Sequence, residues 1–206
     1  MRAWIICKGI TEEQAFYRTI KMNEEDLIIC TDGGFNHAML LGLKPDVLIG
    51  DTDFFEKSPF TSSDVIKCRN NKERSDVHVA VDYALEHNFN EIIMLGAVSG
   101  EISTSLANIM LLIYINQVGG EGLILTKHKR ICLVSHSTFI KRGMNDKVSL
   151  IPLTLKVTGV TTVGLECNFQ NFDLFMGDTL ASETSFSAPE ATVSILSGML
   201  LVICSN

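Results

Sequence analysis

The sequence predicts an α/β protein, with a Rossmann-like, mostly parallel sheet domain over residues 1–127 followed by a small all-β sandwich over residues 128–206. Three observations support this prediction. In the first part, short apolar segments alternate with helical segments, which is typical of a parallel sheet covered on both faces. In the second part, only short strand-like segments punctuated by glycines remain, which favours a sandwich or a barrel. The 206 residues, 46% hydrophobic and 20% charged, are enough for one large or two small domains with a sizeable core.

In the first part, short β-branched apolar runs bounded by Gly, Pro or Asp predict strands. These strands are expected at residues 4–7, 27–30, 47–49, 65–68, 91–95 and 123–126. Helices are expected between them, where capping residues precede apolar positions at helical spacing. The expected helices cover residues 11–20, 36–41, 75–85 and 103–117.

In the second part, the same criteria predict an all-β arrangement without a helix of useful length. The expected strands are at residues 131–134, 147–151, 155–157, 160–163, 192–196 and 199–203.

The bulk composition limits the classes of function and the partners that the chain can have. A net charge of −7 leaves no basic stripe to neutralise nucleic-acid phosphates, and an acidic protein that binds a nucleotide needs a divalent metal as a bridge. Six cysteines without a C-x-x-C pair indicate reduced, buried thiols rather than a zinc site. The apolar runs at the N-terminus and at residues 106–115 are too short for a signal peptide or a membrane span. We therefore expect a cytoplasmic protein without nucleic-acid or membrane partners.

Acidic residues follow two of the predicted strands. Asp32 comes directly after the second strand, and Asp51 and Asp53 come after the third. An Asp-Gly-Gly step alone is a common turn, but open α/β sheets bind their ligands at the carboxyl ends of strands. Asp51 and Asp53 form an oxygen-rich pair suited to Mg²⁺, and Gly33 and Gly34 allow close approach of the backbone to a ligand. These residues predict an enzyme that handles a metal-bound phosphate.

Two further loops support the same prediction. Ser75 or Asp76 can cap the following helix, which is a purely structural role. The same helix N-terminus also suits a phosphate, Lys72 adds a positive charge, and Asp76 can reach the metal. The loop that begins at Gly96 is a glycine-rich turn before a helix, although its spacing is neither that of a Rossmann fingerprint nor that of a P-loop.

Taken together, these segments resemble the thiamine pyrophosphokinase (thiamine diphosphokinase) family. Order and spacing of the motifs hold over nearly the whole chain. The motifs are T-D-G-G-F-N (31–36), L-G-L-K-P-D-V-L-I-G-D-T-D (41–53), K-E-R-S-D (72–76), L-G-A-V-S-G (95–100) with S-L-A-N (105–108) and, more weakly, V-G-L-E (163–166) and V-S-I-L-S-G-M-L-L-V-I (193–203).

The resemblance implies an ATP-dependent enzyme that transfers a pyrophosphoryl group to thiamine, with Mg²⁺, as a homodimer whose thiamine pocket is built partly by the β-rich domain. It assigns catalytic roles to Asp51, Asp53, Asp76 and Lys72, the three aspartates being the metal ligands. Nucleotide-binding roles go to Asp32, Gly33, Gly34, Asn36, Ser75, Gly96 and Asn108. Thiamine-binding roles go to Ser182, Thr184 and Ser185.

The chain departs from the family pattern at three places. In the tail, Cys167 follows G-L-E where the family has a Trp after G-L-K, and E-T-S at residues 183–185 stands near the expected S-N-E run. The usual K-D-x-T-D reads K-E-R-S-D at residues 72–76, and the usual G-G-R-x-D-H reads S-G-E-I-S-T at residues 99–104. Glu101 thus stands where the family has a cation, and we expect Lys72 or Arg74 to balance the phosphate charge instead. Two alternatives stay open: a catalytically weak relative that binds nucleotide or thiamine as a sensor, and a pyrophosphokinase for another hydroxymethyl heterocycle such as a pterin.

Overall fold

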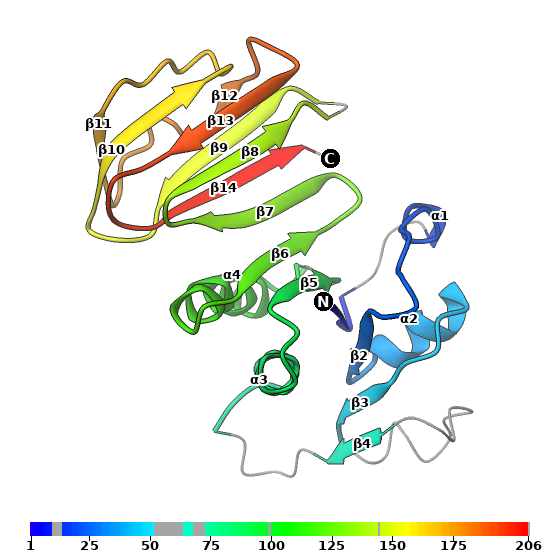
Figure 1. Cartoon of the computed structure of the whole chain (residues 1–206). Helices are drawn as coiled ribbons and strands as arrows, with labels where there is room; N and C mark the ends of the chain where they lie inside the picture. Colours follow the sequence, from blue (N-terminus) through cyan, green and yellow to red (C-terminus); the bar gives the residue numbers. More distant parts are fainter. Residues whose placement is uncertain (10–13, 52–63, 68–72, 99, 144, 206) are drawn as a thin grey trace. The chain divides into compact units, whose positions relative to one another are not determined.

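The computed structural model describes residues 1–9, 14–51, 64–67, 73–98, 100–143 and 145–205. Two units can be distinguished in it, Met1–Lys127 and His128–Asn206. The first is built on parallel strands with helices and the second is all-β (Figure 1). The α/β class with a following β-sandwich, which the sequence predicts, is confirmed.

The N-terminal unit contains a parallel sheet whose strand order is β6-β5-β1-β2-β3-β4. All five neighbouring pairs in this order are parallel. The strands are β1 (Arg2–Ile6), β2 (Leu27–Thr31), β3 (Val47–Gly50), β4 (Asp64–Lys67), β5 (Glu91–Leu95) and β6 (Glu121–Leu125). From β1, the chain adds β2, β3 and β4 in turn on one side of that strand. It then returns and places β5 on the other side of β1. The strand order therefore reverses between β1 and β5, as in doubly wound folds.

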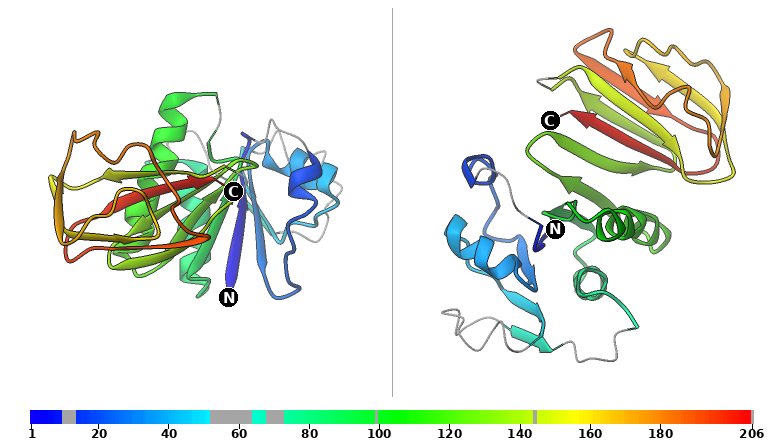
Figure 2. Two further views of the ribbon diagram at one scale, coloured as in Figure 1. Left: turned by 90° about the horizontal axis from the view of Figure 1, so that it is seen from above. Right: turned by 180° about the vertical axis from the view of Figure 1, so that it is seen from behind.

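Helices cover both faces of these strands. They are α1 (Gln14–Tyr17), α2 (Gly34–Leu41), α3 (Asp76–Glu86) and α4 (Ile102–Gln117). The helix α2 lies on one side of the sheet, and α3 and α4 lie on the other (Figures 1 and 2). Trp4 and Ile6 are buried in one cluster with Phe35 and Ala38 of α2. Since successive side chains of a strand point to opposite faces, Ile5, which is fully buried, faces the side of α3 and α4.

A buried carboxylate ties the start of β1 to the turn before β2. Asp26, 9% exposed, accepts hydrogen bonds from Trp4 Nε1 (2.9 Å) and from the backbone N–H of Asn23 (2.9 Å), and it forms an ion pair with Arg2 (3.0 Å). Burial alone would raise the pKa of this carboxyl, but the hydrogen bonds from Asn23, Trp4 and Arg2 outweigh burial, so that the pKa of Asp26 lies below its ordinary value.

We therefore expect acid to weaken the N-terminal unit through Asp26. Because the pKa of Asp26 is lowered in the folded state, its ionised form stabilises the unit above the unfolded pKa of about 3.9, and this contribution is lost as the pH falls below that value. Asp26→Asn should lower the free energy of unfolding at neutral pH by about 1–3 kcal/mol and flatten its acid dependence. Urea titrations followed by the fluorescence of Trp4, the one tryptophan of the chain, measure both effects. An unchanged acid dependence in the variant would contradict this assignment.

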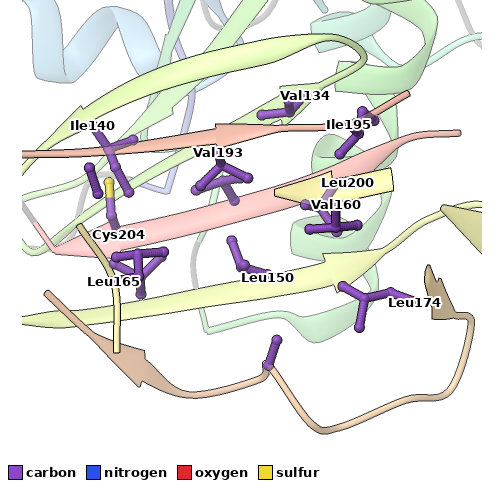
Figure 3. Packing of buried hydrophobic residues seen from close by; sticks show 14 of the residues in the cluster. Val134, Ile140, Leu150, Val160, Leu165, Leu174, Val193, Ile195, Leu200 and Cys204 are labelled. Atoms are coloured by element: carbon purple, nitrogen blue, oxygen red, sulfur yellow. The ribbon is translucent and has the colours of Figure 1, made fainter. Parts of the chain in front are cut away.

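The C-terminal unit is a sandwich of two antiparallel sheets. One sheet has the order β12-β9-β14-β7 and the other the order β11-β10-β13-β8. The strands are β7 (Lys129–Val134), β8 (Ser137–Lys141), β9 (Lys147–Pro152), β10 (Lys156–Val163), β11 (Phe172–Phe175), β12 (Thr184–Ser185), β13 (Glu190–Ser194) and β14 (Leu200–Ser205). Aliphatic side chains from both sheets form the core between them, with Leu150 and Leu200 from one sheet meeting Val160 and Val193 from the other (Figure 3).

Some elements differ from those expected. Of the helix expected at 11–20, residues 11–13 lie outside the described residues, and α1 ends at Tyr17 because the chain turns at residues 18 and 19. The strands expected at 155–157 and 160–163 form the single strand β10, whose pairing with β11 shifts register between Val157 and Val160. Gly159 adopts a positive φ of 66° inside this strand, which accounts for the apparent break in the sequence. The strands β8, β11 and β12 were not expected.

In the described part of the chain, no helix combines the length and the apolar character needed to cross a bilayer. The described cysteines are all free thiols. They are Cys7, Cys30, Cys132, Cys167 and Cys204, while Cys68 lies outside the described residues.

Candidate active site

The carboxyl ends of the parallel strands lie along one edge of the N-terminal sheet. The central strands are tightly joined there: the N–H of Cys7 donates to the carbonyl of Leu95 (2.8 Å), and the N–H of Gly9 donates to the carbonyl of Gly96 (3.1 Å). These bonds join the loops after β1 and β5, between which the strand order reverses. In open α/β sheets this reversal is the place where ligands bind.

The loop after β2 packs closely against the neighbouring strands β1 and β3. Asp32 has a positive φ of 45° and donates its N–H to the carbonyl of Ile49 (3.0 Å). Its carboxylate lies against β3, because a Cβ added to Gly50 would be only 2.7 Å from Asp32 Oδ1. A Cβ on Gly34 would lie 2.0 Å from the carbonyl oxygen of Ile6. The D-G-G segment is therefore shaped by close backbone approach, which only glycine permits at residue 34.

Two further candidate carboxylates are described. Asp51 directly follows β3 and is half-buried, and Asp76 is buried in the first turn of α3. A carboxylate in that turn is favoured by the helix dipole. The structure thus places Asp32 and Asp51 after neighbouring strands, as the sequence predicts. Asp53 lies outside the described residues, and among the described ones no group of three or more His, Cys, Asp or Glu forms a ready metal site.

The helix α3 begins as the sequence predicts. Ser75 is its N-cap, and the Ser75 hydroxyl accepts a hydrogen bond from the N–H of His78 (3.2 Å). Ser75 thus has the structural role of a helix cap, and its hydroxyl is hydrogen-bonded to the helix backbone. Lys72, the proposed phosphate contact before this helix, lies outside the described residues.

The loop after β5 is supported by α4. Gly96 has a positive φ of 68°, and the buried side chain of Asn108 donates from Nδ2 to the carbonyl of Ala97 (2.7 Å). Asn108 thus holds the loop in shape from within α4. Glu101 is the N-cap residue of α4, makes no side-chain capping bond and is exposed to solvent. Asn36, on the first turn of α2, is also exposed.

The guanidinium group of Arg74 is occupied by contacts within the protein. Its guanidinium pairs with Asp82 of α3 and lies over the ring of Tyr114, with Cζ 5.7 Å from the ring centroid. The Tyr114 hydroxyl donates to the same carboxylate (2.6 Å). The hydrogen bond and charge of Asp82 raise the pKa of Arg74. Of the two cations expected to replace the missing one, Arg74 already has its carboxylate partner.

The predicted thiamine-binding residues lie in and beside β12 of the C-terminal unit. Thr184 is buried, and its hydroxyl accepts a hydrogen bond from the N–H of Cys167 (3.1 Å). Ser182 is exposed and its hydroxyl donates to the carbonyl of Thr179 (2.8 Å). Ser185 is half-buried and its carbonyl accepts from the N–H of Glu166 (2.9 Å). The contacts of Thr184 and Ser185 connect β12 to the loop that carries the V-G-L-E motif.

Sequence reasoning missed two residues at the edge of the N-terminal sheet. Lys8 follows β1 as Asp32 follows β2, so its strand-end position could have singled it out. His37 of α2 donates from Nε2 to the carbonyl of Lys8 (3.0 Å), a contact that no sequence spacing indicates. Cys7 also lies here, but burial, with a smaller contribution from the charge of Asp32, raises the pKa of its thiol to about 12. Cys7 therefore stays protonated and does not serve as a nucleophile.

Comparison with known proteins agrees with the motifs. Residues 20–121 match the family model of the thiamin pyrophosphokinase catalytic domain. Residues 136–200 match that of the thiamin pyrophosphokinase vitamin B1 binding domain. Together the two matches span most of the chain, in the order of the two units.

Individual relatives support the same family. A thiamine pyrophosphokinase of Bacillus subtilis is 25% identical over 137 residues, which are 66% of this chain and 64% of that protein. The crystal structure of thiamine pyrophosphokinase from Bacillus subtilis has a TM-score of 0.86 at 22% identity, covering 100% of this chain and 99% of the other. That of thiamin pyrophosphokinase from Geobacillus thermodenitrificans has the same TM-score and identity, with 100% and 98% covered. These structures show a shared fold, and the two family models show that the chain belongs to the thiamin pyrophosphokinase family.

Proposed function

We propose that this chain transfers the β,γ-pyrophosphoryl group of ATP to thiamine, forming thiamine diphosphate and AMP. The observation that carries the proposal is the sheet edge where Asp32, in its glycine-shaped loop, and Asp51 follow the neighbouring strands β2 and β3, next to the reversal of strand order between β1 and β5. Membership of the thiamin pyrophosphokinase family supports thiamine as the acceptor.

The reaction balances with no other reactant. The hydroxyl oxygen of thiamine forms a bond to the β-phosphorus of ATP, and the bond from that phosphorus to the α,β-bridging oxygen breaks. AMP leaves with the bridging oxygen, and the proton of the thiamine hydroxyl is released to the solvent. Charge develops on phosphoryl oxygens throughout, so the protein contributes mainly by positioning groups and by electrostatic stabilisation.

The donor set fits a magnesium ion. Asp51 and Asp76 are carboxylates at the same sheet edge, and Mg²⁺ is usually bound by one or two carboxylates together with substrate phosphates rather than by a cage of protein ligands. We propose Asp51, Asp53 and Asp76 as its ligands, with Asp53 contributing from outside the described residues. The ion, when bound, would neutralise and orient the phosphate oxygens.

The other residues would bind and orient the nucleotide. The backbone of Gly33 and Gly34, the turn at Gly96 and the segment of Ser75 are suited to phosphate oxygens, because each lies at the start of a helix or in a glycine-rich turn. Asp32 would face the same ligand from the end of β2. We propose that Asn36 and Asn108 help to bind the nucleotide by shaping the two loops. Lys72 would contribute its positive charge.

Thiamine would be held with the help of the C-terminal unit. We propose that Ser182, Thr184 and Ser185, in or beside β12, contribute to the pocket, and that the enzyme is a homodimer. A monomer in light scattering at assay concentration would contradict the dimer. The free thiols among the described residues, three of them buried, suit a reducing compartment and support a cytoplasmic location.

The decisive experiment measures AMP formation from ATP and Mg²⁺ with and without thiamine. We expect AMP and thiamine diphosphate in equal amounts, and none without thiamine. AMP formed with a hydroxymethyl pterin instead would identify a different acceptor. Binding of both ligands without turnover would identify a sensor. Either of the last two outcomes would overturn the proposal.

A further inference from the structure

Lys8 occupies the position after β1 where the strand order reverses. β1 pairs with β2 on one side and with β5 on the other, and Lys8 is the second residue beyond its end. The loop that carries Lys8 is held on both sides, by the bond from Gly9 to Gly96 and by the bond from His37 to the carbonyl of Lys8. The backbone of Lys8 is therefore fixed between the loops proposed to bind the nucleotide.

The side chain of Lys8 crosses towards the loop after β2. A Cβ added to Gly33 would lie 3.2 Å from Lys8 Cγ and 3.7 Å from Lys8 Cδ. The aliphatic stem thus rests on Gly33, next to Asp32 in sequence, while the residue as a whole is exposed. Lysine commonly packs its stem in this way and keeps its ammonium group in water. A small residue at 33 is what leaves room for the stem.

Several acidic residues surround this edge of the sheet, so the positive charge of Lys8 is significant there. Asp32, Asp51 and Asp76 are negative, and Glu101 adds a further exposed carboxylate at the start of α4. Arg74 is paired with Asp82. Among the described residues, no ion pair involves Lys8, so its charge is available to an anion arriving from solvent.

We propose that the ammonium group of Lys8 binds the polyphosphate of ATP and supplies positive charge that Glu101 does not. This inference rests on the proposed pyrophosphokinase function and adds a residue to the same site. Lys8 is a binding residue that holds the nucleotide by charge-assisted hydrogen bonding. It complements the metal, since carboxylates alone would repel the phosphates.

The test compares variants that keep the stem with variants that keep the charge. Lys8→Met and Lys8→Gln retain much of the packing on Gly33 and lose the charge, and Lys8→Arg retains the charge. Lys44→Met is the matched control, because it removes one positive charge from an exposed lysine before β3, at the opposite edge of the same sheet. The readouts are calorimetric binding of a non-hydrolysable ATP analogue with Mg²⁺, without thiamine, and the KM and kcat of the complete reaction.

We expect Lys8→Met and Lys8→Gln to weaken analogue binding and to raise the KM for ATP by about tenfold to a hundredfold. The KM for thiamine should stay unchanged, Lys8→Arg should recover most of the affinity, and Lys44→Met should behave as the unchanged protein. Wild-type binding by both neutral variants would overturn the proposal. Equal losses in Lys8→Arg or in Lys44→Met would also overturn it, because the effect would then not depend on a charge at this position.

The outcomes separate this inference from the proposed function. If the unchanged chain makes AMP with thiamine and the neutral variants match it, the role of Lys8 fails and the function stands. If the unchanged chain makes no AMP but the neutral variants bind the analogue more weakly, the function fails and Lys8 remains a nucleotide-binding residue.

Discussion

Asp51→Asn is expected to lower the rate of thiamine-dependent AMP formation at least about a hundredfold while the protein stays folded. The substitution keeps the size of the side chain and removes its negative charge. Asp51 is half-buried directly after β3, beside the loop that carries Asp32, so it is well placed to hold a metal ion on the phosphates. Losing a charged ligand weakens both metal binding and the stabilisation of the transition state.

The matched control is Asp64→Asn. Asp64 is exposed at the first position of β4, at the edge of the sheet opposite to Asp51, so the variant makes the same change in net charge away from the site. We expect it to retain activity, and both variants to unfold at the same urea concentration as the unchanged chain. The metal concentration that gives half-maximal rate should rise in Asp51→Asn alone. Full activity in Asp51→Asn would refute its proposed role as a metal ligand.

Gly34→Ala is expected to destabilise the N-terminal unit by about 3 kcal/mol or more, or to prevent its folding. The added Cβ would lie 2.0 Å from the carbonyl oxygen of Ile6, at the end of the central strand β1. The position of the Cβ is fixed by the backbone of residue 34 and the carbonyl belongs to the backbone of Ile6, so no side-chain rotation relieves the overlap. The helix α2 would have to move away from β1, and with it Phe35, which packs in the same cluster as Trp4 and Ile6.

Gly100→Ala is the control for the loss of a glycine. A Cβ at residue 100 meets no atom within 4 Å and needs no positive φ, so this variant should unfold like the unchanged chain. Unfolding in urea, followed by the fluorescence of Trp4, reports directly on the N-terminal unit, because Trp4 lies buried within it. If Gly34→Ala were as stable as Gly100→Ala, the close approach of α2 to β1 would be disproved.

Much of the N-terminal fold can be predicted from the chain alone, because its strands are buried on both faces and read as continuous apolar runs. The run Leu27–Thr31 and the run Val47–Gly50 are examples, each ended by an acidic residue that marks the sheet edge. Strands of the sandwich are harder to predict. β8 (Ser137–Lys141) and β11 (Phe172–Phe175) are short and have one buried residue each, and Asp173 interrupts the apolar residues of β11, so neither forms a continuous apolar run. Their conformation depends on pairing with β13 and β10.

The sequence by itself determined the class of the fold, the family, the strand-end positions of Asp32 and Asp51 and the helix-start position of Asp76, because these depend on local apolar runs, capping residues and residue order. Only the tertiary structure decided which groups meet. It pairs Arg74 with Asp82, lays Lys8 on Gly33 and sets Asp32 against Gly50. The contacts of Lys8 and Asp32 join segments that are distant in the chain, and the Arg74–Asp82 pair is completed by Tyr114 from another helix. Their distances follow from strand order and packing, which no local pattern of residues encodes.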